Sequence, residues 1–229
     1  MTRSYFGHTL IHPLGLLALV CISIAFLAVR RKEALIPMLV MAIFIPSAQR
    51  LVLGGLDFTL LRLTTTAGWI RVLLRNETKQ FRVIPLDTVV LLWGISSVIT
   101  FTLLHQSFGA LANRLGYFVD TAGVYFLGRV LIREPEDVRR VVSSIMVIAV
   151  PVLILFMIEA TTGRNMFSVF GGVPSHTYVR AGRLRVQGAF SHPILAGAFW
   201  AAILPMVAVR LMEGAYRRDL VLYSLGLLG

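Results

Sequence analysis

Residues 180–205 read RAGRLRVQGAFSHPILAGAFWAAILP, and they set three arginines directly before an apolar run of helical length. The three are Arg180, Arg183 and Arg185, and the apolar run begins at Pro193. A guanidinium group is a planar fork of donors that matches the geometry of a phosphate. The stretch therefore predicts a membrane helix with cations at its mouth, where an anionic, lipid-linked head group would be held.

The composition agrees with a membrane protein. Of the 229 residues, 57% are hydrophobic and 14% are charged. This leaves too little polar surface to coat a water-soluble globule of that size. The net charge of +11 falls in short gaps between apolar stretches, which is typical of topology signals and of contacts with anionic head groups. We therefore expect membrane lipids as partners and no nucleic acid.

A membrane helix needs about 20 apolar residues, because each residue adds about 1.5 Å of rise. Stretches near that length are 9–29, 34–48, 58–74, 86–104, 115–132, 141–159 and 193–212. An eighth begins at Leu220 and reaches about half that length at Gly229, so we expect the N-terminal part of a larger membrane protein. The predicted fold class is all-α: a polytopic transmembrane helix bundle in which residues 1–229 form a single membrane domain.

The orientation follows from the basic residues. Fourteen of the 22 lie in the gaps after the odd-numbered stretches, which places those gaps in the cytoplasm. The long segment 161–192 then lies outside and holds Arg164, Arg180, Arg183 and Arg185. Arginines on the outside run against the topology rule, and binding an anion would explain them. The alternative is that segment 161–192 is a solvated loop whose arginines anchor it at the membrane interface.

Two histidines follow serines in this outer segment, in Ser175-His176 and Ser191-His192. Adjacent residues rarely have the geometry of a nucleophile and its base, and no acidic residue lies nearby to complete a triad. His176 is interpreted as an exposed loop residue. Two roles stay open for His192: a hydrogen bond to the substrate or to the Arg185 loop, and capping of the helix that follows.

Ionisable residues inside the apolar stretches need partners or a cavity. Asp120 and Arg129 lie nine residues apart, so we expect them not to pair with each other. Asp120 is expected to pair with Arg62 or Arg114, either as a structural pair or as part of a substrate site. Arg129 is close enough to the inner end to reach water. Arg62 is also a candidate second phosphate contact.

No two His, Cys, Asp or Glu residues outside the apolar stretches stand at ligand spacing, so no metal site is expected. The sequence also lacks a P-loop and a dinucleotide-binding glycine run, and we expect no cofactor. A lipid-linked sugar donor is therefore favoured over a nucleotide sugar. Cys21, the single cysteine, lies in an apolar run and is expected to pack there.

The order Arg185, Gly188, Phe190 and Pro193, followed by Gly197 within an apolar helix, resembles the signature of the bacterial O-antigen ligase and O-antigen polymerase family. The sequence departs from the pattern after the proline, where it has isoleucine and the family usually has asparagine. The resemblance implies a multi-pass inner-membrane glycosyltransferase. Such enzymes transfer or polymerise an undecaprenyl-pyrophosphate-linked glycan, O-antigen or exopolysaccharide, on the periplasmic face, with an acceptor glycolipid and without metal.

The resemblance also implies roles for individual residues. The family's catalytic base, a histidine, lies in a large outer loop two helices further on, so no catalytic residue is expected within residues 1–229. These residues would supply the pyrophosphate-binding part, with Arg185 near the pyrophosphate. Together with the residues selected above by charge and placement, the candidate binding residues are Arg185, Arg183, Arg180, Arg62 and His192; Arg180 and Arg183 are not aligned with a position of the family. The structural motif residues are Gly188, Phe190, Pro193 and Gly197.

Two other classes of function stay open. A secondary transporter or a lipid-glycan flippase would also place arginines at a helix mouth to meet anionic head groups. Transporters usually show repeated halves, and the sequence shows no such repeat. The third class is a non-catalytic membrane assembly subunit.

Overall fold

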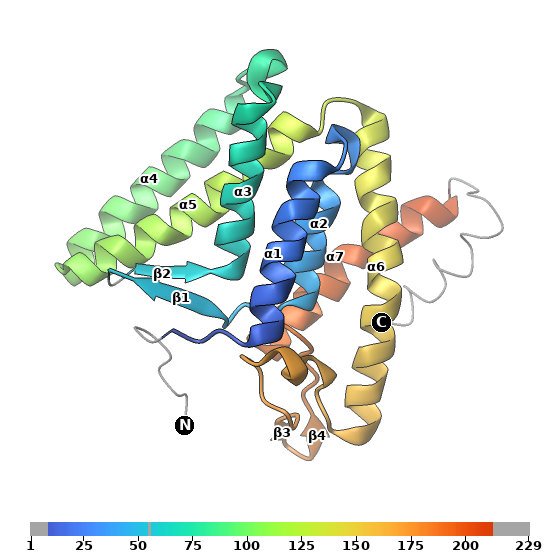
Figure 1. Cartoon of the computed structure of the whole chain (residues 1–229). Coiled ribbons are helices and arrows are strands. Elements are labelled where there is room, and N and C mark those ends of the chain that lie inside the picture. Colours follow the sequence, from blue (N-terminus) through green and yellow to red (C-terminus); the bar gives the residue numbers. More distant parts are fainter. Residues whose placement is uncertain (1–8, 55, 213–229) are drawn as a thin grey trace.

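The computed structural model describes residues 9–54 and 56–212 and is mostly helical (Figure 1). Its seven α-helices are α1 (Pro13–Ala28), α2 (Leu35–Phe44), α3 (Leu60–Leu74), α4 (Pro85–His105), α5 (Phe108–Leu131), α6 (Pro135–Thr162) and α7 (Pro193–Met212). Three short 3-10 helices are η1 (Arg31–Glu33), η2 (Glu77–Gln80) and η3 (Met166–Phe170). The strands are β1 (Arg50–Leu53), β2 (Leu56–Thr59), β3 (Val179–Arg180) and β4 (Arg183–Leu184).

Successive helices run in alternating directions, so the connections gather at two ends of the bundle (Figure 1). The turn end holds η1, η2 and the short connection from α5 to α6. The loop end holds the β1–β2 hairpin and the segment 163–192, which contains η3 and the β3–β4 hairpin. The sequence predicted this alternation, because each of the seven apolar stretches overlaps one of the helices, although α4, α5 and α6 extend beyond theirs.

Local chemistry sets where several helices begin and end. Helix α2 stops at Phe44 because Ile45 precedes a proline and takes an extended conformation, with φ −98° and ψ 123°. The third helix begins at Leu60, two residues later than expected, because Thr59 caps it by accepting from the Arg62 N–H at 3.2 Å. The two residues before the cap belong to β2. The expectation of helices alone is therefore corrected by two short antiparallel hairpins.

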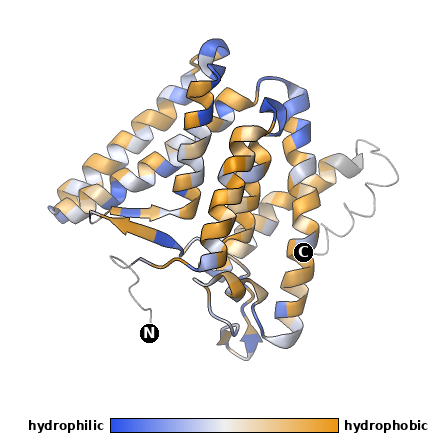
Figure 2. Ribbon diagram, in the orientation of Figure 1, coloured by the Kyte–Doolittle hydropathy of each residue, from blue (hydrophilic) through white to orange (hydrophobic). Residues whose placement is uncertain are grey.

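Two of the described helices, α4 and α6, have the length and composition needed to cross a membrane. Helix α1 and residues Pro193–Val209 of α7 are apolar but shorter. Large apolar side chains are nevertheless exposed along the bundle: on α4, Leu92, Leu103 and Leu104 are 62%, 68% and 77% exposed. Figure 2 shows apolar residues along the helices and hydrophilic residues concentrated at the turn end.

The buried core has two main parts. One joins α1, α2, α3 and α5 around Phe26, Val72 and Leu127, which are fully buried. The other joins α6, α7 and the segment 163–192 around Val152, Phe167 and Val207. The second cluster carries the candidate site, because it packs the outer segment directly on α6 and α7.

Basic residues at the turn end close the helix ends. The guanidinium of Arg71 is buried, donates to the carbonyls of Phe26 (2.6 Å) and Val29 (2.7 Å), and pairs with Glu77 at 3.1 Å. Arg31 likewise donates to the Leu131 carbonyl at 2.5 Å. These carbonyls end α1 and α5, where a cation is favoured by the helix dipole. Arg31 and Arg71, which the sequence indicated only as signals of membrane orientation, therefore also stabilise the ends of helices.

Candidate anion-binding loop

The three arginines lie on and beside a tight hairpin. Strands β3 and β4 pair so that Arg180 stands directly opposite Arg183. The two turn residues, Ala181 (φ 51°) and Gly182 (φ 72°), both have positive φ, as a type I′ turn requires. The pairing continues one step further, because the Arg185 N–H donates to the Tyr178 carbonyl at 2.8 Å.

This register directs the side chains of all three arginines to one face of the hairpin. Residues directly opposite each other share a face, and so do residues two apart on one strand. Arg180 and Arg183 are exposed, and Arg185 is half-buried. Like charges directly opposite each other are destabilising. We refer to residues 177–187 as the arginine hairpin.

Nothing in the described structure balances this charge locally. Within residues 9–54 and 56–212, none of the three arginines forms an ion pair. The sequence from Ala160 to Met212 contains no aspartate or glutamate. The arrangement can therefore hold a multivalent anion such as a phosphate, which would relieve the repulsion.

Gly188 occupies a position that only glycine fits. Its φ is +57°, and a Cβ built on it would stand 2.1 Å from Cε2 of Phe156. Its backbone is held at both ends: its N–H donates to Glu159 Oε2 at 2.9 Å, and its carbonyl accepts from Asn165 Nδ2 at 2.8 Å. The backbone after Arg185 is thus fixed against α6.

The other motif residues lead into α7. Phe190 packs on Phe156 and Phe199, with ring centroids 6.4 and 5.2 Å apart. Pro193 is the first residue of α7, where its missing N–H costs nothing. A Cβ on Gly197 would meet no atom within 4 Å, so packing within the described residues does not explain that glycine.

His192 caps α7. Its Nδ1 accepts from the Ile194 N–H at 3.2 Å, and its carbonyl accepts from the Leu195 N–H at 3.0 Å. Of the two roles left open by the sequence, capping is the one with observed contacts. His12 caps α1 in the same way, so the feature is not peculiar to the loop. His176 is exposed, as expected, and forms an isolated bridge with Arg164.

Arg62 lies in a salt bridge between α3 and α5. Its Nε and Nη2 donate to the two carboxylate oxygens of Asp120 at 2.6 and 2.7 Å, and Nη1 donates to the Asp57 carbonyl. The prediction that Asp120 pairs with Arg62 or Arg114, and not with Arg129, is confirmed. Arg114 instead stacks over the ring of Phe101 at 4.3 Å. The charge of Arg62 is thus balanced, unlike that of the arginine hairpin.

Arg129 reaches the turn end, where its side chain is 28% exposed and pairs with Asp87. Its Nε donates to Oδ1 of Asp87 at 3.1 Å, and the Tyr125 hydroxyl donates to the same oxygen at 2.7 Å. This network ties α4 to α5 near the turn end.

Two buried residues that organise the backbone around Gly188 were not predicted from the sequence: Glu159 of α6 and Asn165 of the outer segment. Glu159 carried a weak signal, since an acid ends an otherwise apolar 141–159 stretch. Asn165 carried none.

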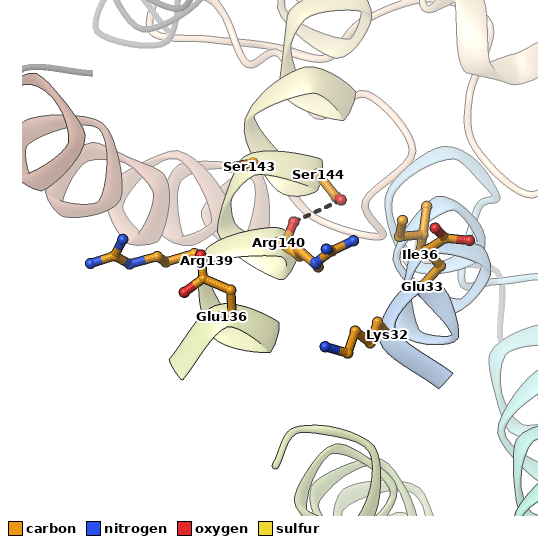
Figure 3. A pocket seen from close by; sticks show the side chains of 8 residues that line it. All are labelled: Lys32, Glu33, Ile36, Glu136, Arg139, Arg140, Ser143 and Ser144. Carbon is orange, nitrogen blue, oxygen red and sulfur yellow. Dashed lines mark hydrogen bonds between the residues drawn. The ribbon is translucent and has the colours of Figure 1, made fainter. Parts of the chain in front are cut away.

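A separate hollow of about 550 Å³ lies at the turn end, between η1 and the start of α6 (Figure 3). It is lined by Lys32, Glu33, Ile36, Glu136, Arg139, Arg140, Ser143 and Ser144. Acids and bases face each other there, and Lys32 is also paired with Glu134 at 3.3 Å. The hollow is at the opposite end of α6 from the arginine hairpin, so the two are distinct sites.

In the described part of the chain, no group of three or more His, Cys, Asp or Glu side chains is placed to hold a metal ion. Comparison with protein-family models, with curated proteins and with solved structures finds no match to this chain.

Proposed function

We propose that the arginine hairpin binds the diphosphate of a lipid-linked glycan at the outer face of a membrane helix bundle. The observation that carries the proposal is the register that sets Arg180 directly opposite Arg183, with Arg185 on the same face and no ion pair for any of them among the described residues. A diphosphate carries several negative charges over a short distance, and it therefore suits three clustered guanidinium groups better than a carboxylate does.

A membrane setting is supported by the distribution of apolar residues. Helices α4 and α6 are long and apolar enough to cross a bilayer, and α4 exposes large aliphatic side chains over its length. Exposed apolar surface of this extent needs a lipid or protein cover. We propose a polytopic bundle in the inner membrane of a bacterium, with the turn end in the cytoplasm and the loop end outside.

The class of reaction is supported by the motif from Arg185 to Gly197. We propose that the chain is the N-terminal part of an enzyme of the O-antigen ligase and polymerase type. An acceptor hydroxyl attacks the anomeric carbon, the bond to the pyrophosphate oxygen breaks, and a base outside these residues takes the hydroxyl proton. Arg185 stabilises the negative charge on the leaving undecaprenyl pyrophosphate.

The direct test is binding of a soluble polyprenyl diphosphate. Purified chain in lipid nanodiscs is titrated with farnesyl diphosphate, and Arg185→Ala is compared with Arg164→Ala, an exposed arginine of the same outer segment. Loss of a charge-assisted contact predicts affinity about tenfold weaker for Arg185→Ala and near wild type for Arg164→Ala. Equal affinity of all three proteins contradicts the proposal.

The enzyme that contains the catalytic loop gives a second test. There, Arg185→Ala is expected to abolish glycan transfer and to leave membrane insertion intact. Normal transfer by this variant rules out its role at the pyrophosphate.

The hollow at the turn end favours a second candidate, a flippase or secondary transporter. Such a protein meets an anionic head group on both faces, and Lys32, Arg139 and Arg140 line the hollow opposite the arginine hairpin. Proteoliposomes loaded with a fluorescent polyprenyl diphosphate decide between the candidates. Protein-dependent movement between leaflets supports transport, and binding without movement supports the transferase.

A further inference from the structure

Glu159 is a buried carboxylate in the last turn of α6 and has no basic partner among the described residues. It is 0% exposed. An isolated buried carboxylate is costly unless donors surround it. Here three donors do: the Thr177 hydroxyl at 2.9 Å and the Gln187 N–H at 3.1 Å reach Oε1, and the Gly188 N–H at 2.9 Å reaches Oε2.

These donors lie at the base of the arginine hairpin, before β3 and after β4. Thr177 directly precedes Tyr178, the residue that pairs with Arg185, and Gln187 lies two residues after Arg185. A single carboxylate oxygen therefore closes the two ends of the hairpin. The Thr177 N–H also donates to the carbonyl of Gly163, the C-cap of α6, at 2.8 Å.

The helix beneath this contact is firmly packed. Val152, Phe156 and Glu159 follow one another on the same face of α6, and all three are buried. Phe156 contacts the rings of Phe167 and Trp200, with centroids 6.4 and 5.6 Å apart. Helix α6 is thus a fixed support from which Glu159 reaches the hairpin.

The Gln187 and Gly188 N–H groups are successive backbone donors that both reach one carboxylate, and successive N–H groups of this kind can bind anions. Because Glu159 occupies these donors, a substrate phosphate does not bind there. A phosphate would instead bind to the side chains of the arginine hairpin. The position of those side chains depends on the Glu159 carboxylate at the base of the hairpin.

We propose that Glu159 is the positioning residue of the arginine hairpin: it fixes the base of the hairpin so that the three guanidinium groups converge on a diphosphate in preference to a monophosphate. This inference rests on the proposed function and adds to it a specificity determinant. Glu159 acts through the backbone and does not contact the ligand.

The test is the ratio of affinities for farnesyl diphosphate and farnesyl monophosphate, measured on the chain in nanodiscs. Glu159→Gln keeps the shape of the side chain but places an NH₂ group against the Gly188 N–H. We expect wild type to prefer the diphosphate about tenfold and Glu159→Gln to retain a preference of about threefold or less. A general loss of folding would lower both affinities together and leave the ratio unchanged.

Two further variants complete the design. Thr177→Val removes one donor without touching the carboxylate and is expected to give an intermediate ratio. Glu134→Gln removes a negative charge from the exposed other end of α6 and is expected to match wild type. Amide hydrogen exchange, which needs no ligand, is expected to speed up at residues 178–188 in Glu159→Gln and to stay unchanged in α4 and α5.

The outcomes separate the two proposals. If wild type shows no affinity for either farnesyl phosphate, the proposed function is overturned, and the positioning role with it. If wild type prefers the diphosphate and Glu159→Gln keeps the same preference, the proposed function stands and the positioning role of Glu159 is overturned.

Discussion

At the scale of single residues, the outer loop depends on Gly188, which is constrained both by its backbone conformation and by its packing. The two constraints can be tested separately. Gly188 has positive φ and also faces the Phe156 ring, whereas Gly182 has positive φ with no atom within 4 Å of a built Cβ. A left-handed conformation costs a non-glycine residue about 1–2 kcal/mol, and a steric overlap in a packed site adds about 1–3 kcal/mol. Gly182 is therefore a control for Gly188, because it shares the positive φ but lacks the contact with Phe156.

Gly188→Ala is expected to lower the free energy of unfolding by about 2–5 kcal/mol, and Gly182→Ala by about 1–2 kcal/mol. Denaturant unfolding of the detergent-solubilised chain measures both. A third variant, Gly197→Ala, adds a methyl group to an open position within α7 and is expected to be neutral or slightly stabilising. Similar losses for Gly188→Ala and Gly182→Ala would refute the contact with Phe156.

At the scale of elements, the helices of the bundle are joined by ion pairs between neighbours. Arg62 of α3 reaches Asp120 of α5, and their side chains are 19% and 33% exposed. An exposed ion pair contributes about 0–1 kcal/mol to stability, whereas removing one partner of a buried pair costs about 3–5 kcal/mol. A partly buried pair is expected to lie between these two values. We take about 1–3 kcal/mol as the cost of breaking this pair.

A double-mutant cycle with Arg62→Ala and Asp120→Ala tests whether Arg62 serves the fold or the ligand. Each single variant is expected to lose about 1–3 kcal/mol of stability, and the double variant less than the sum, because neither partner is left alone. Farnesyl diphosphate affinity of the double variant is expected to match wild type. Strictly additive losses would show that the ion pair has no coupling energy, and weaker binding would make Arg62 a phosphate contact.

At the scale of the whole molecule, the bundle has two chemically different ends. The turn end holds helix-capping arginines and mixed ion pairs, whereas the arginines of the loop end include three without an ionic partner in the described residues. An apolar belt lies between these ends (Figure 2). This division predicts opposite sides of a membrane.

Cysteine labelling checks the orientation. In a Cys21→Ser background, Ser175→Cys at the loop end is expected to react with a membrane-impermeant maleimide in intact spheroplasts, because the proposed topology places that end outside. Lys79→Cys, in η2 at the turn end, is expected to react only after permeabilisation. Both positions are exposed, so burial does not confound the result. Labelling of both in intact spheroplasts would contradict the proposed topology.

The local sequence determined the helices and the location of unusual charge. Hydropathy and proline positions can be read from neighbours along the chain, and they predicted the seven helices and the cluster of Arg180, Arg183 and Arg185. For His192 the sequence left two roles open, and the structure showed that it caps α7. Hydropathy and proline positions did not give the strands, because strands of two to four residues carry too short a pattern to be recognised in the sequence. The resemblance to a glycan-transfer family stays a prediction.

The tertiary structure decided which residues meet. Either Arg62 or Arg114 suited Asp120 by sequence, and helix packing selected Arg62 because α3 lies against α5. Register, which no single residue encodes, set Arg180 opposite Arg183. Glu159 reaches the arginine hairpin from 18 and 28 residues away in the chain, and only the packing of the outer segment on α6 brings them together. Contacts of this kind depend on three-dimensional distance, about which composition and periodicity carry no information.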